Sequence, residues 1–307
     1  MRAEGGPVRV AVIGIGSNSV RLLVADCQGG SYRVVLRDRC GTRLFAGLRE
    51  GELSEESMEG SCTAACGMAL RARALGAAEM YAFATSAARD AANGEAFRDM
   101  LRERAELELD ICTGEEEARL SYYGAARAGL CGLIDIGGGS TEWTIGRDGT
   151  PLAAISLQIG AVRLHQAVRI AGSGDLPAAV ACAEEALTAG LKALAAAPRP
   201  PLWIGVGGTF TTLAAMDMQL SAFDRSLVEG YPLREERVRH WACVLADMPV
   251  EVRRSLPGLQ PQRADIAAHG IAILIACFRL LGFDSITVSD QGNLDGYLHA
   301  RMREFIS

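Results

Sequence analysis

A short glycine-rich turn occurs twice in the 307-residue chain, and each copy directly follows an apolar run. The first turn is Gly14-Ile-Gly-Ser-Asn-Ser19, and the second turn is Asp135-Ile-Gly-Gly-Gly-Ser140. A second run with strand character follows each copy, so both segments predict a β-hairpin. A duplicated domain with one such turn in each half explains both the similarity and the placement of the two copies.

These turns have the composition of phosphate-binding segments. Glycine lets successive backbone amides point into one concavity and approach a phosphate closely. Hydroxyl and amide side chains add further donors around the same space. We therefore expect phosphate contacts from these residues: Gly16, Ser17, Asn18, Ser19, Gly137, Gly138, Gly139, Ser140 and Thr141. A plain hairpin turn is the alternative for either segment taken alone.

The second turn also carries an acid. Asp135 lies near the end of the apolar strand expected at 133–136, where a carboxylate is costly unless it binds something. A two-residue hairpin turn needs neither this acid nor three consecutive glycines. A magnesium ion or another hard cation that arrives with the phosphates would satisfy Asp135.

A third glycine segment lies at 202–212. An apolar strand runs into Gly205-Val-Gly-Gly-Thr209, and a helix is expected to follow. Free amides and the helix dipole then point in the same direction, which favours an anion. The segment matches neither the P-loop pattern nor the G-x-G-x-x-G fingerprint of dinucleotide-binding proteins.

An acidic segment, Thr113-Gly-Glu-Glu-Glu-Ala-Arg119, begins a predicted helix. Three glutamates in a first helical turn favour the helix dipole, and this alone explains an ordinary helix start. The functional alternative is that one carboxylate orients or deprotonates a water that attacks phosphorus. The pattern alone does not say which glutamate would do so.

Composition limits the classes of partner. The length and the 49% hydrophobic content favour two domains. The formal charge of −6 gives no overall attraction for nucleic acid or anionic membranes, so neither partner is expected, and local groups must hold a polyanion. Nine cysteines without a C-x-x-C pair, no signal-peptide pattern and no apolar run of membrane length together favour a cytoplasmic protein with reduced thiols.

Further sequence blocks add a family resemblance. They begin at the first turn and continue with Ala84-Thr-Ser-Ala-Ala-Arg-Asp-Ala91, the acidic segment, the second turn with Glu142, Ser156-Leu-Gln-Ile-Gly-Ala-Val-Arg-Leu164, Gly207-Gly-Thr-Phe-Thr-Thr-Leu213, Arg263-Ala-Asp-Ile266 and Ser289-Asp-Gln-Gly292. These blocks appear in the order typical of one family and span nearly the whole chain. The sequence resembles the exopolyphosphatase / guanosine pentaphosphate phosphohydrolase (Ppx/GppA) family of the actin, sugar kinase and Hsp70-like superfamily.

The resemblance implies an α/β, two-lobed actin-like (ribonuclease H-like) fold with duplicated domains and an interlobe cleft. We expect lobe I at residues 1–128 and lobe II at 129–292. A C-terminal helix from about residue 293 to residue 307 is expected to pack back on lobe I. The chain is shorter than family members that carry extra C-terminal helical domains, so a long polyphosphate channel would have to come from a homodimer or be absent.

The resemblance also assigns roles to single residues. Glu117 matches the family's catalytic carboxylate, Glu142 a second active-site acid, and Asp135 an aspartate linked to the metal, so Asp135 and Glu142 are the expected ligands of Mg²⁺ or another divalent cation such as Mn²⁺. The remaining assigned residues are expected to contact phosphate: Gly137 to Thr141, Gly207, Gly208, Thr209, Arg89 and Arg263.

The expected activity is hydrolysis that releases the terminal phosphate from inorganic polyphosphate, guanosine pentaphosphate or both, with the substrate between the two turns. One alternative is a nucleotide-dependent phosphotransferase of the same superfamily. The other is a non-catalytic protein that binds polyphosphate or an alarmone. Gly14 motivates this last alternative, because family members usually have an aspartate at that position.

Overall fold

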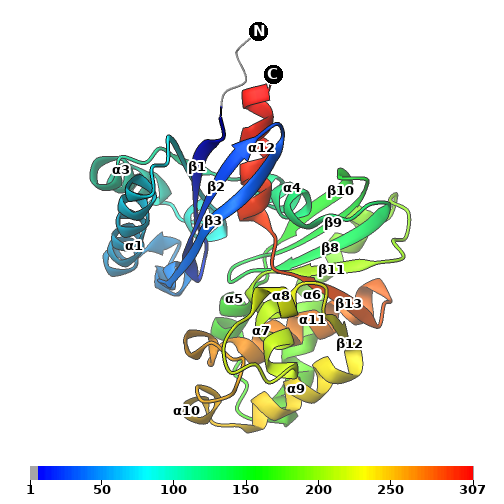
Figure 1. Ribbon diagram of the computed structural model, residues 1–307. Coiled ribbons are helices and arrows are strands. Elements are labelled where there is room, and N and C mark those ends of the chain that lie inside the picture. The colour runs from blue at the N-terminus through cyan, green and yellow to red at the C-terminus, as the bar shows by residue number, and fades with distance from the viewer. Residues whose placement is uncertain (1–5, 307) are drawn as a thin grey trace. The chain divides into compact units, whose positions relative to one another are not determined.

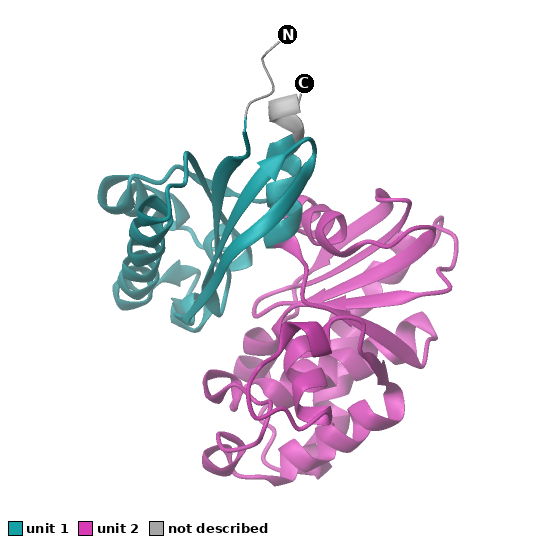
Figure 2. Cartoon of the chain, viewed as in Figure 1, with its two compact units in different colours: residues 1–113, 294–307 teal, residues 114–293 magenta. Residues whose placement is uncertain are grey.

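The computed structural model describes residues 6–306, with side chains through residue 302. The chain divides into two compact units (Figure 2). Unit 1 comprises Met1–Thr113 and Leu294–Ser307, and unit 2 comprises Gly114–Asn293. Each unit contains its own mixed β-sheet.

The division falls after Thr113. From the sequence we expected it after residue 128. The segment in question is helix α4 (Gly114–Ala125). Its residues Tyr122 and Ala125 are buried in an apolar cluster with Leu133 and Val206 of unit 2. Because its apolar face packs on the second sheet, α4 belongs to unit 2.

The sheet of unit 1 has five strands in the order β3-β2-β1-β6-β7 (Figure 1). The strands are β1 (Val8–Ile15), β2 (Ser19–Gln28), β3 (Ser31–Gly41), β6 (Glu79–Ala84) and β7 (Leu109–Ile111). Neighbouring strands among β1, β2 and β3 pair antiparallel, whereas β6 pairs parallel with β1 and β7 parallel with β6. The hairpin predicted around the first turn is therefore present.

The other elements of unit 1 before Thr113 are short except for two helices. They are the 3₁₀ turn Leu44–Gly47, the strand pair β4 (Leu48–Arg49) and β5 (Glu52–Leu53), and helices α1 (Glu55–Ala74), α2 (Ser86–Arg89) and α3 (Gly94–Ala105). Helix α1 begins directly after Ser54. The Ser54 side chain accepts a hydrogen bond from the amide of Ser57, which caps the helix start, and Cys62 and Ala65 are among its buried residues.

The C-terminal helix α12 (Asn293–Ile306) packs on the sheet of unit 1. The Tyr297 ring stacks on Phe83 of β6, with 4.6 Å between the ring centroids. The helix also contacts the edge strand β3. The buried Asp295 carboxylate accepts a hydrogen bond from the Tyr32 hydroxyl over 2.7 Å and forms an ion pair with Arg37. Polar contacts to β3 and an aromatic contact to β6 thus hold the helix across the sheet.

The sheet of unit 2 has six strands in the order β10-β9-β8-β11-β13-β12. The strands are β8 (Leu130–Ile136), β9 (Thr141–Arg147), β10 (Thr150–Leu157), β11 (Trp203–Val206), β12 (Pro232–Arg234) and β13 (Ser285–Ser289). Its first five strands repeat the order and the directions found in unit 1, and β12 adds an antiparallel edge. The predicted duplication is therefore present in the topology.

Unit 2 contains the larger core. Its helices besides α4 are α5 (Ala161–Ala167), α6 (Leu176–Leu194), α7 (Gly208–Asp217), α8 (Arg225–Val228), α9 (Glu235–Asp247), α10 (Val250–Arg253) and α11 (Ala267–Leu281), with 3₁₀ turns at Ser173–Asp175 and Pro261–Arg263. The fully apolar stretch of α11 lies inside the core beside Trp143 of the sheet. Within the part of the chain that the structure describes, no helix combines the length and the apolar character needed to cross a membrane.

Candidate phosphate and cation site

The two glycine turns have the same closing hydrogen bond. The amide of Gly16 donates to the carbonyl oxygen of Ser19 over 3.0 Å, and the amide of Gly137 donates to the carbonyl oxygen of Ser140 over 3.0 Å. Each turn joins the first two strands of its sheet, β1 to β2 and β8 to β9. The short sequence repeat is therefore also a structural repeat.

The second turn is fixed by the start of α5. The carbonyl of Gly137 accepts a hydrogen bond from the Ala161 amide over 2.9 Å, and the carbonyl of Gly138 accepts one from the Val162 amide over 2.8 Å. Among the described residues, the amides of Gly138 and Gly139 donate to no protein acceptor. Hydrogen bonds within the protein thus satisfy the carbonyl oxygens of Gly137 and Gly138. Two amides of the turn are left to bind a ligand, as an anion site requires.

Three buried carboxylates lie in unit 2 near this turn. Asp135 of β8 is directly opposite Glu142 of β9, and Glu117 lies in the first turn of α4, which packs on these strands. Their exposed fractions are 7%, 0% and 5%. The structure thus brings together the two predicted catalytic acids, Glu117 and Glu142, and the predicted metal ligand Asp135.

Two hydroxyl groups orient these acids. Ser121 donates a hydrogen bond to Oδ2 of Asp135 over 2.7 Å, and Ser156 donates one to Oε1 of Glu142 over 2.7 Å. The remaining oxygen of Glu142, Oε2, is buried and has no hydrogen-bond partner among the described residues. An ionised carboxylate with one unsatisfied buried oxygen needs a proton or a cation.

The electrostatics of Glu142 agree with this need. Burial raises the pKa of its carboxyl well above the usual value, and the charges of Glu117 and Asp135 raise it further. The hydroxyls of Ser140 and Ser156 lower the pKa but do not offset the larger effects. A divalent cation would neutralise the mutual repulsion of the three acids.

The donor set fits a hard cation, which prefers oxygen ligands. Within the described residues, no group of three or more His, Cys, Asp or Glu side chains is arranged to hold a metal ion by itself. Magnesium commonly binds through one or two carboxylates, with water and substrate phosphates as its other ligands. The site therefore fits a cation that shares its coordination with a phosphate ligand.

The third glycine segment approaches one of these acids, Asp135. Gly207, between β11 and α7, has a φ of +91°, and a Cβ atom at this position would lie 2.6 Å from Oδ1 of Asp135. Glycine is therefore required both for its backbone conformation and for the close approach to the carboxylate. The start of α7, with its free amides, lies next to the acid at the end of β8.

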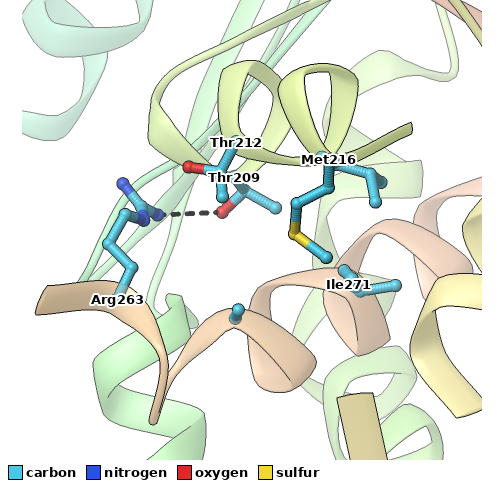
Figure 3. Close-up of a pocket in the computed structure, with 7 residues that line it drawn as sticks. Thr209, Thr212, Met216, Arg263 and Ile271 are labelled. Atoms are coloured by element: carbon cyan, nitrogen blue, oxygen red, sulfur yellow. Dashed lines mark hydrogen bonds between the residues drawn. The ribbon is translucent and has the colours of Figure 1, made fainter. Parts of the chain in front are cut away.

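Arg263 lies against this helix start (Figure 3). Its guanidinium donates to Oγ1 of Thr209 over 3.4 Å and occupies the space that a Cβ on Gly208 would need. A small cavity lies beside it, lined by Thr209, Thr212, Leu213, Met216, Arg263, Ala267 and Ile271, with a volume of about 10 Å³. That volume holds about one water molecule. The structure thus groups three residues predicted to contact phosphate, Gly208, Thr209 and Arg263.

The phosphate contacts predicted at the first turn and at Arg89 lie in unit 1. The hydroxyls of Ser17 and Ser86 are 2.7 Å apart, which connects the first turn to the helix that carries Arg89. One guanidinium nitrogen of Arg89 donates to the carbonyl of Cys112 over 3.2 Å. The amides of Thr42 and Arg43 both donate to the carbonyl of Asn18 over 3.2 Å. The first turn is therefore fixed by two segments of its own unit.

Sequence reasoning missed Ser121 and Ser156. Ser121 follows Glu117 by four residues, and this spacing places both on one face of a helix. It could therefore have been found once Glu117 was singled out. Ser156 is opposite Glu142 across the β9–β10 pair, but a register shift between Pro151 and Ala153 hides this pairing from a simple count.

A duplicated sheet with a glycine turn in each copy, three buried acids and a free-amide turn defines a phosphate-handling protein of the actin-like fold, which confirms the predicted fold class. The chain belongs to the Ppx/GppA phosphatase family, whose model matches residues 16–305. Exopolyphosphatase 2 of Mycobacterium tuberculosis is 33% identical to it, over 94% of this chain and 97% of that protein.

Solved structures agree with this assignment. An exopolyphosphatase-like protein aligns with a TM-score of 0.89 and 28% identity, over 97% of this chain and all of that one. The Ppx/GppA family member from Aquifex aeolicus aligns with a TM-score of 0.82 and 27% identity, over 98% of this chain and 99% of that one. Nearly the whole chain, and not one unit alone, corresponds to these relatives.

Proposed function

We propose that the protein is an exopolyphosphatase-type phosphohydrolase, which releases the terminal phosphate of inorganic polyphosphate by attack of water. The observation that carries the proposal is the group of three buried acids, Glu117, Asp135 and Glu142, beside a turn with two amides that donate to no acceptor within the described residues. Membership of a phosphatase family and relatives named as exopolyphosphatases support it.

In this proposal the glycine turn and the start of α7 bind phosphate oxygens. The amides of Gly138 and Gly139 and those at the start of α7 donate to them, and Arg263 adds positive charge. Phosphoryl transfer depends mainly on positioning and charge stabilisation, so such donors supply much of the catalysis.

Glu117 is the proposed general base. It orients a water molecule, whose oxygen forms a bond to the terminal phosphorus while the bond from phosphorus to the bridging oxygen breaks. The bridging oxygen leaves with the electron pair, and Glu117 accepts the proton of the water. The first turn of a helix that packs on the two other acids is a rigid position for this role.

Asp135 and Glu142 are the proposed ligands of a divalent cation, with Mg²⁺ as the first choice and Mn²⁺ as the alternative. When bound, such a cation neutralises charge that develops on the phosphate oxygens. Its binding would also relieve the repulsion that raises the pKa of Glu142. Guanosine pentaphosphate contains the same kind of phosphoanhydride and is the second candidate substrate.

The test is Glu117→Gln, which keeps the shape of the side chain and removes its basicity. We expect phosphate release from polyphosphate to fall by about 100-fold or more, with no loss of thermal stability. Glu116→Gln is the matched control, because the neighbouring Glu116 is exposed. Wild-type turnover by the Glu117 variant would exclude this residue as the base.

A non-catalytic binding protein is the second candidate, and the surroundings of Gly14 favour it. The acid that is usual in the family is absent here. Phe83 and Leu294 fill the space that a side chain at this position would need. Tight binding of polyphosphate without phosphate release, in both Mg²⁺ and Mn²⁺, would support this candidate. Consumption of ATP without consumption of polyphosphate would instead indicate a phosphotransferase.

A further inference from the structure

The segment that leads into α5 lies directly against one side of the second glycine turn. A Cβ atom on Gly160 would lie 2.5 Å from the carbonyl oxygen of Gly138 and 2.6 Å from the amide nitrogen of Gly139. Gly160 has an extended backbone, so the lack of space, and not the backbone conformation, excludes a larger residue here. The peptides of the turn are therefore closely packed against this segment.

Three consecutive carbonyl oxygens of the turn accept hydrogen bonds from the start of α5. Backbone amides of the helix donate to the carbonyls of Gly137 and Gly138 over 2.8–3.1 Å. The third carbonyl, that of Gly139, accepts a hydrogen bond from the side chain of Arg163, whose Nε lies 2.8 Å away. The backbone thus holds the first two peptides of the turn, and one side chain holds the third.

The direction of each carbonyl determines the direction of the next amide. In a planar trans peptide, the C=O of one residue and the N–H of the following residue point to opposite sides. The hydrogen bond to the Gly139 carbonyl therefore turns the Ser140 amide away from Arg163, to the side that the amides of Gly138 and Gly139 also face. Among the described residues, the Ser140 amide donates to no protein acceptor. Three consecutive amides can then bind one anion.

The duplicated turn of unit 1 has the same peptide fixed in a different way. Because the two turns share their closing hydrogen bond, Asn18 corresponds to Gly139. The Asn18 carbonyl accepts hydrogen bonds from the backbone amides of Thr42 and Arg43, each over 3.2 Å. Both copies of the turn thus hold this carbonyl, unit 1 with backbone amides and unit 2 with an arginine side chain. In unit 2 the contact can therefore be removed by a single substitution.

Arg163 lies on the carbonyl side of this peptide, opposite to the side that the amide faces. Its Nε donates to the Gly139 carbonyl, and its Nη2 donates to Oε1 of Gln158 over 2.8 Å. A charged donor on a carbonyl oxygen also polarises the peptide, which makes the N–H of the same peptide a stronger donor. Arg163 can therefore strengthen anion binding by the turn without touching the anion.

We propose that Arg163 is a positioning residue of the second turn. It holds the Gly139 carbonyl so that the Ser140 amide becomes a third donor to a phosphate group, beside the amides of Gly138 and Gly139. The choice of ligand rests on the proposed function, in which this turn binds phosphate oxygens of polyphosphate. A third donor fixes the orientation of the phosphate as well as its position, and attack of water in line with the scissile bond requires both.

The first test compares phosphate release by three variants of the full chain in Mg²⁺. Arg163→Met removes the donor, and we expect kcat to fall about tenfold with a smaller change in KM, since a charge-assisted hydrogen bond is lost. Arg163→Gln removes the charge but places Nε2 as many bonds from the backbone as the arginine Nε, so it should restore most of the turnover. Arg163→Lys keeps the charge without a donor at that place and should be slower than Arg163→Gln.

The order of the three variants distinguishes positioning from direct contact. If the guanidinium acted on the phosphate through its charge, Arg163→Lys would be faster than Arg163→Gln, and this order would overturn the proposal. Wild-type turnover by Arg163→Met, or equally low turnover by Arg163→Met and Arg163→Gln, would also overturn it. Arg169→Met is the control, because Arg169 is an exposed arginine just beyond α5, and it should keep wild-type turnover.

A second measurement follows the amides themselves and needs no turnover. Inorganic phosphate with Mg²⁺ should shift the NMR signals of the Gly138, Gly139 and Ser140 amides in the wild type. In Arg163→Met the shift at Ser140 should be lost while that at Gly138 remains, because the Ala161 amide still holds the preceding carbonyl. A wild type in which the Ser140 signal does not respond would overturn the proposal. Phosphate release by the wild type tests the proposed function separately, since these amides can bind phosphate in a protein that hydrolyses nothing.

Discussion

The hydroxyl of Ser121 donates a hydrogen bond to Oδ2 of Asp135 over 2.7 Å, and both side chains are buried. This contact fixes one oxygen of the carboxylate and leaves Oδ1 near the backbone of Gly207. Ser121 is therefore a positioning residue for the proposed cation ligand. Hydrogen bonds of this kind commonly change metal affinity when they are removed.

Ser121→Ala should raise the Mg²⁺ concentration needed for half-maximal phosphate release by about tenfold, while turnover at saturating Mg²⁺ changes little. The reason is that Asp135 loses its fixed orientation but keeps its charge. Ser61→Ala is the control, because Ser61 is an equally buried serine in unit 1 and its hydroxyl has no partner among the described residues. An unchanged Mg²⁺ requirement would show that Ser121 does not position the acid.

Gly207→Ala should reduce both stability and activity. The methyl group would lie 2.6 Å from Oδ1 of Asp135, and the φ of +91° is unfavourable for alanine. Gly149→Ala separates these effects, because Gly149 also has a positive φ, +77°, but open space around its Cβ position.

Urea unfolding should show a loss of about 1 kcal/mol for Gly149→Ala from backbone strain alone, and a larger loss for Gly207→Ala. Phosphate release should fall only in the Gly207 variant, because only that methyl group displaces the acid. If the two variants lose the same stability and keep the same activity, the close approach to Asp135 has no functional role.

The hairpins and the duplication could be predicted because the signals are local. A β-branched run, a glycine turn and a second run specify a hairpin within about 20 residues, and the chain repeats this pattern. The acids of the site could be assigned through the family resemblance, and the structure places Glu117, Asp135 and Glu142 together in unit 2.

Other features depend on long-range packing and could not be read from the sequence. The position of α4 in unit 2 follows from burial of Tyr122 against the second sheet, which the helix's own pattern does not show. The contact between Ser156 and Glu142 depends on the irregular register near Pro151. The filling of the space beside Gly14 involves Leu294, which is 280 positions away in the chain.

Low pH should destabilise the protein through protonation of His269 in the unfolded chain. This residue is buried, and burial lowers the pKa of its imidazole to about 4, with smaller effects from the charges of His165 and Arg253. The backbone hydrogen bonds to Val168 and Asp265 act in the opposite direction. Between pH 6.5 and 4 the unfolded chain therefore binds a proton that the folded protein does not, so stability falls as the pH falls through this range.

Between pH 7 and pH 5, the titration of His269 should lower the free energy of unfolding by about 2 kcal/mol. His269→Gln should remove that part of the pH dependence, since glutamine does not titrate and can still donate to the carbonyl of Val168, which lies 2.9 Å from Nε2 of the histidine. His240→Gln, at an exposed position on α9, is the control. Equal pH dependence of the wild type and the His269 variant, measured by urea unfolding, would contradict the prediction.

Restoring an acid at position 14 should not restore a cation ligand unless space is made for it. Gly14→Asp would bury a carboxylate against Phe83 and Leu294, at a cost of about 3 kcal/mol in unfolding free energy. Leu294→Ala is destabilising by itself but removes one of the two obstructing side chains. We therefore expect the double variant to be more stable than the sum of the two single changes predicts, by about 1 kcal/mol or more. Additive losses in a urea-unfolding cycle would show that Leu294 does not exclude the acid.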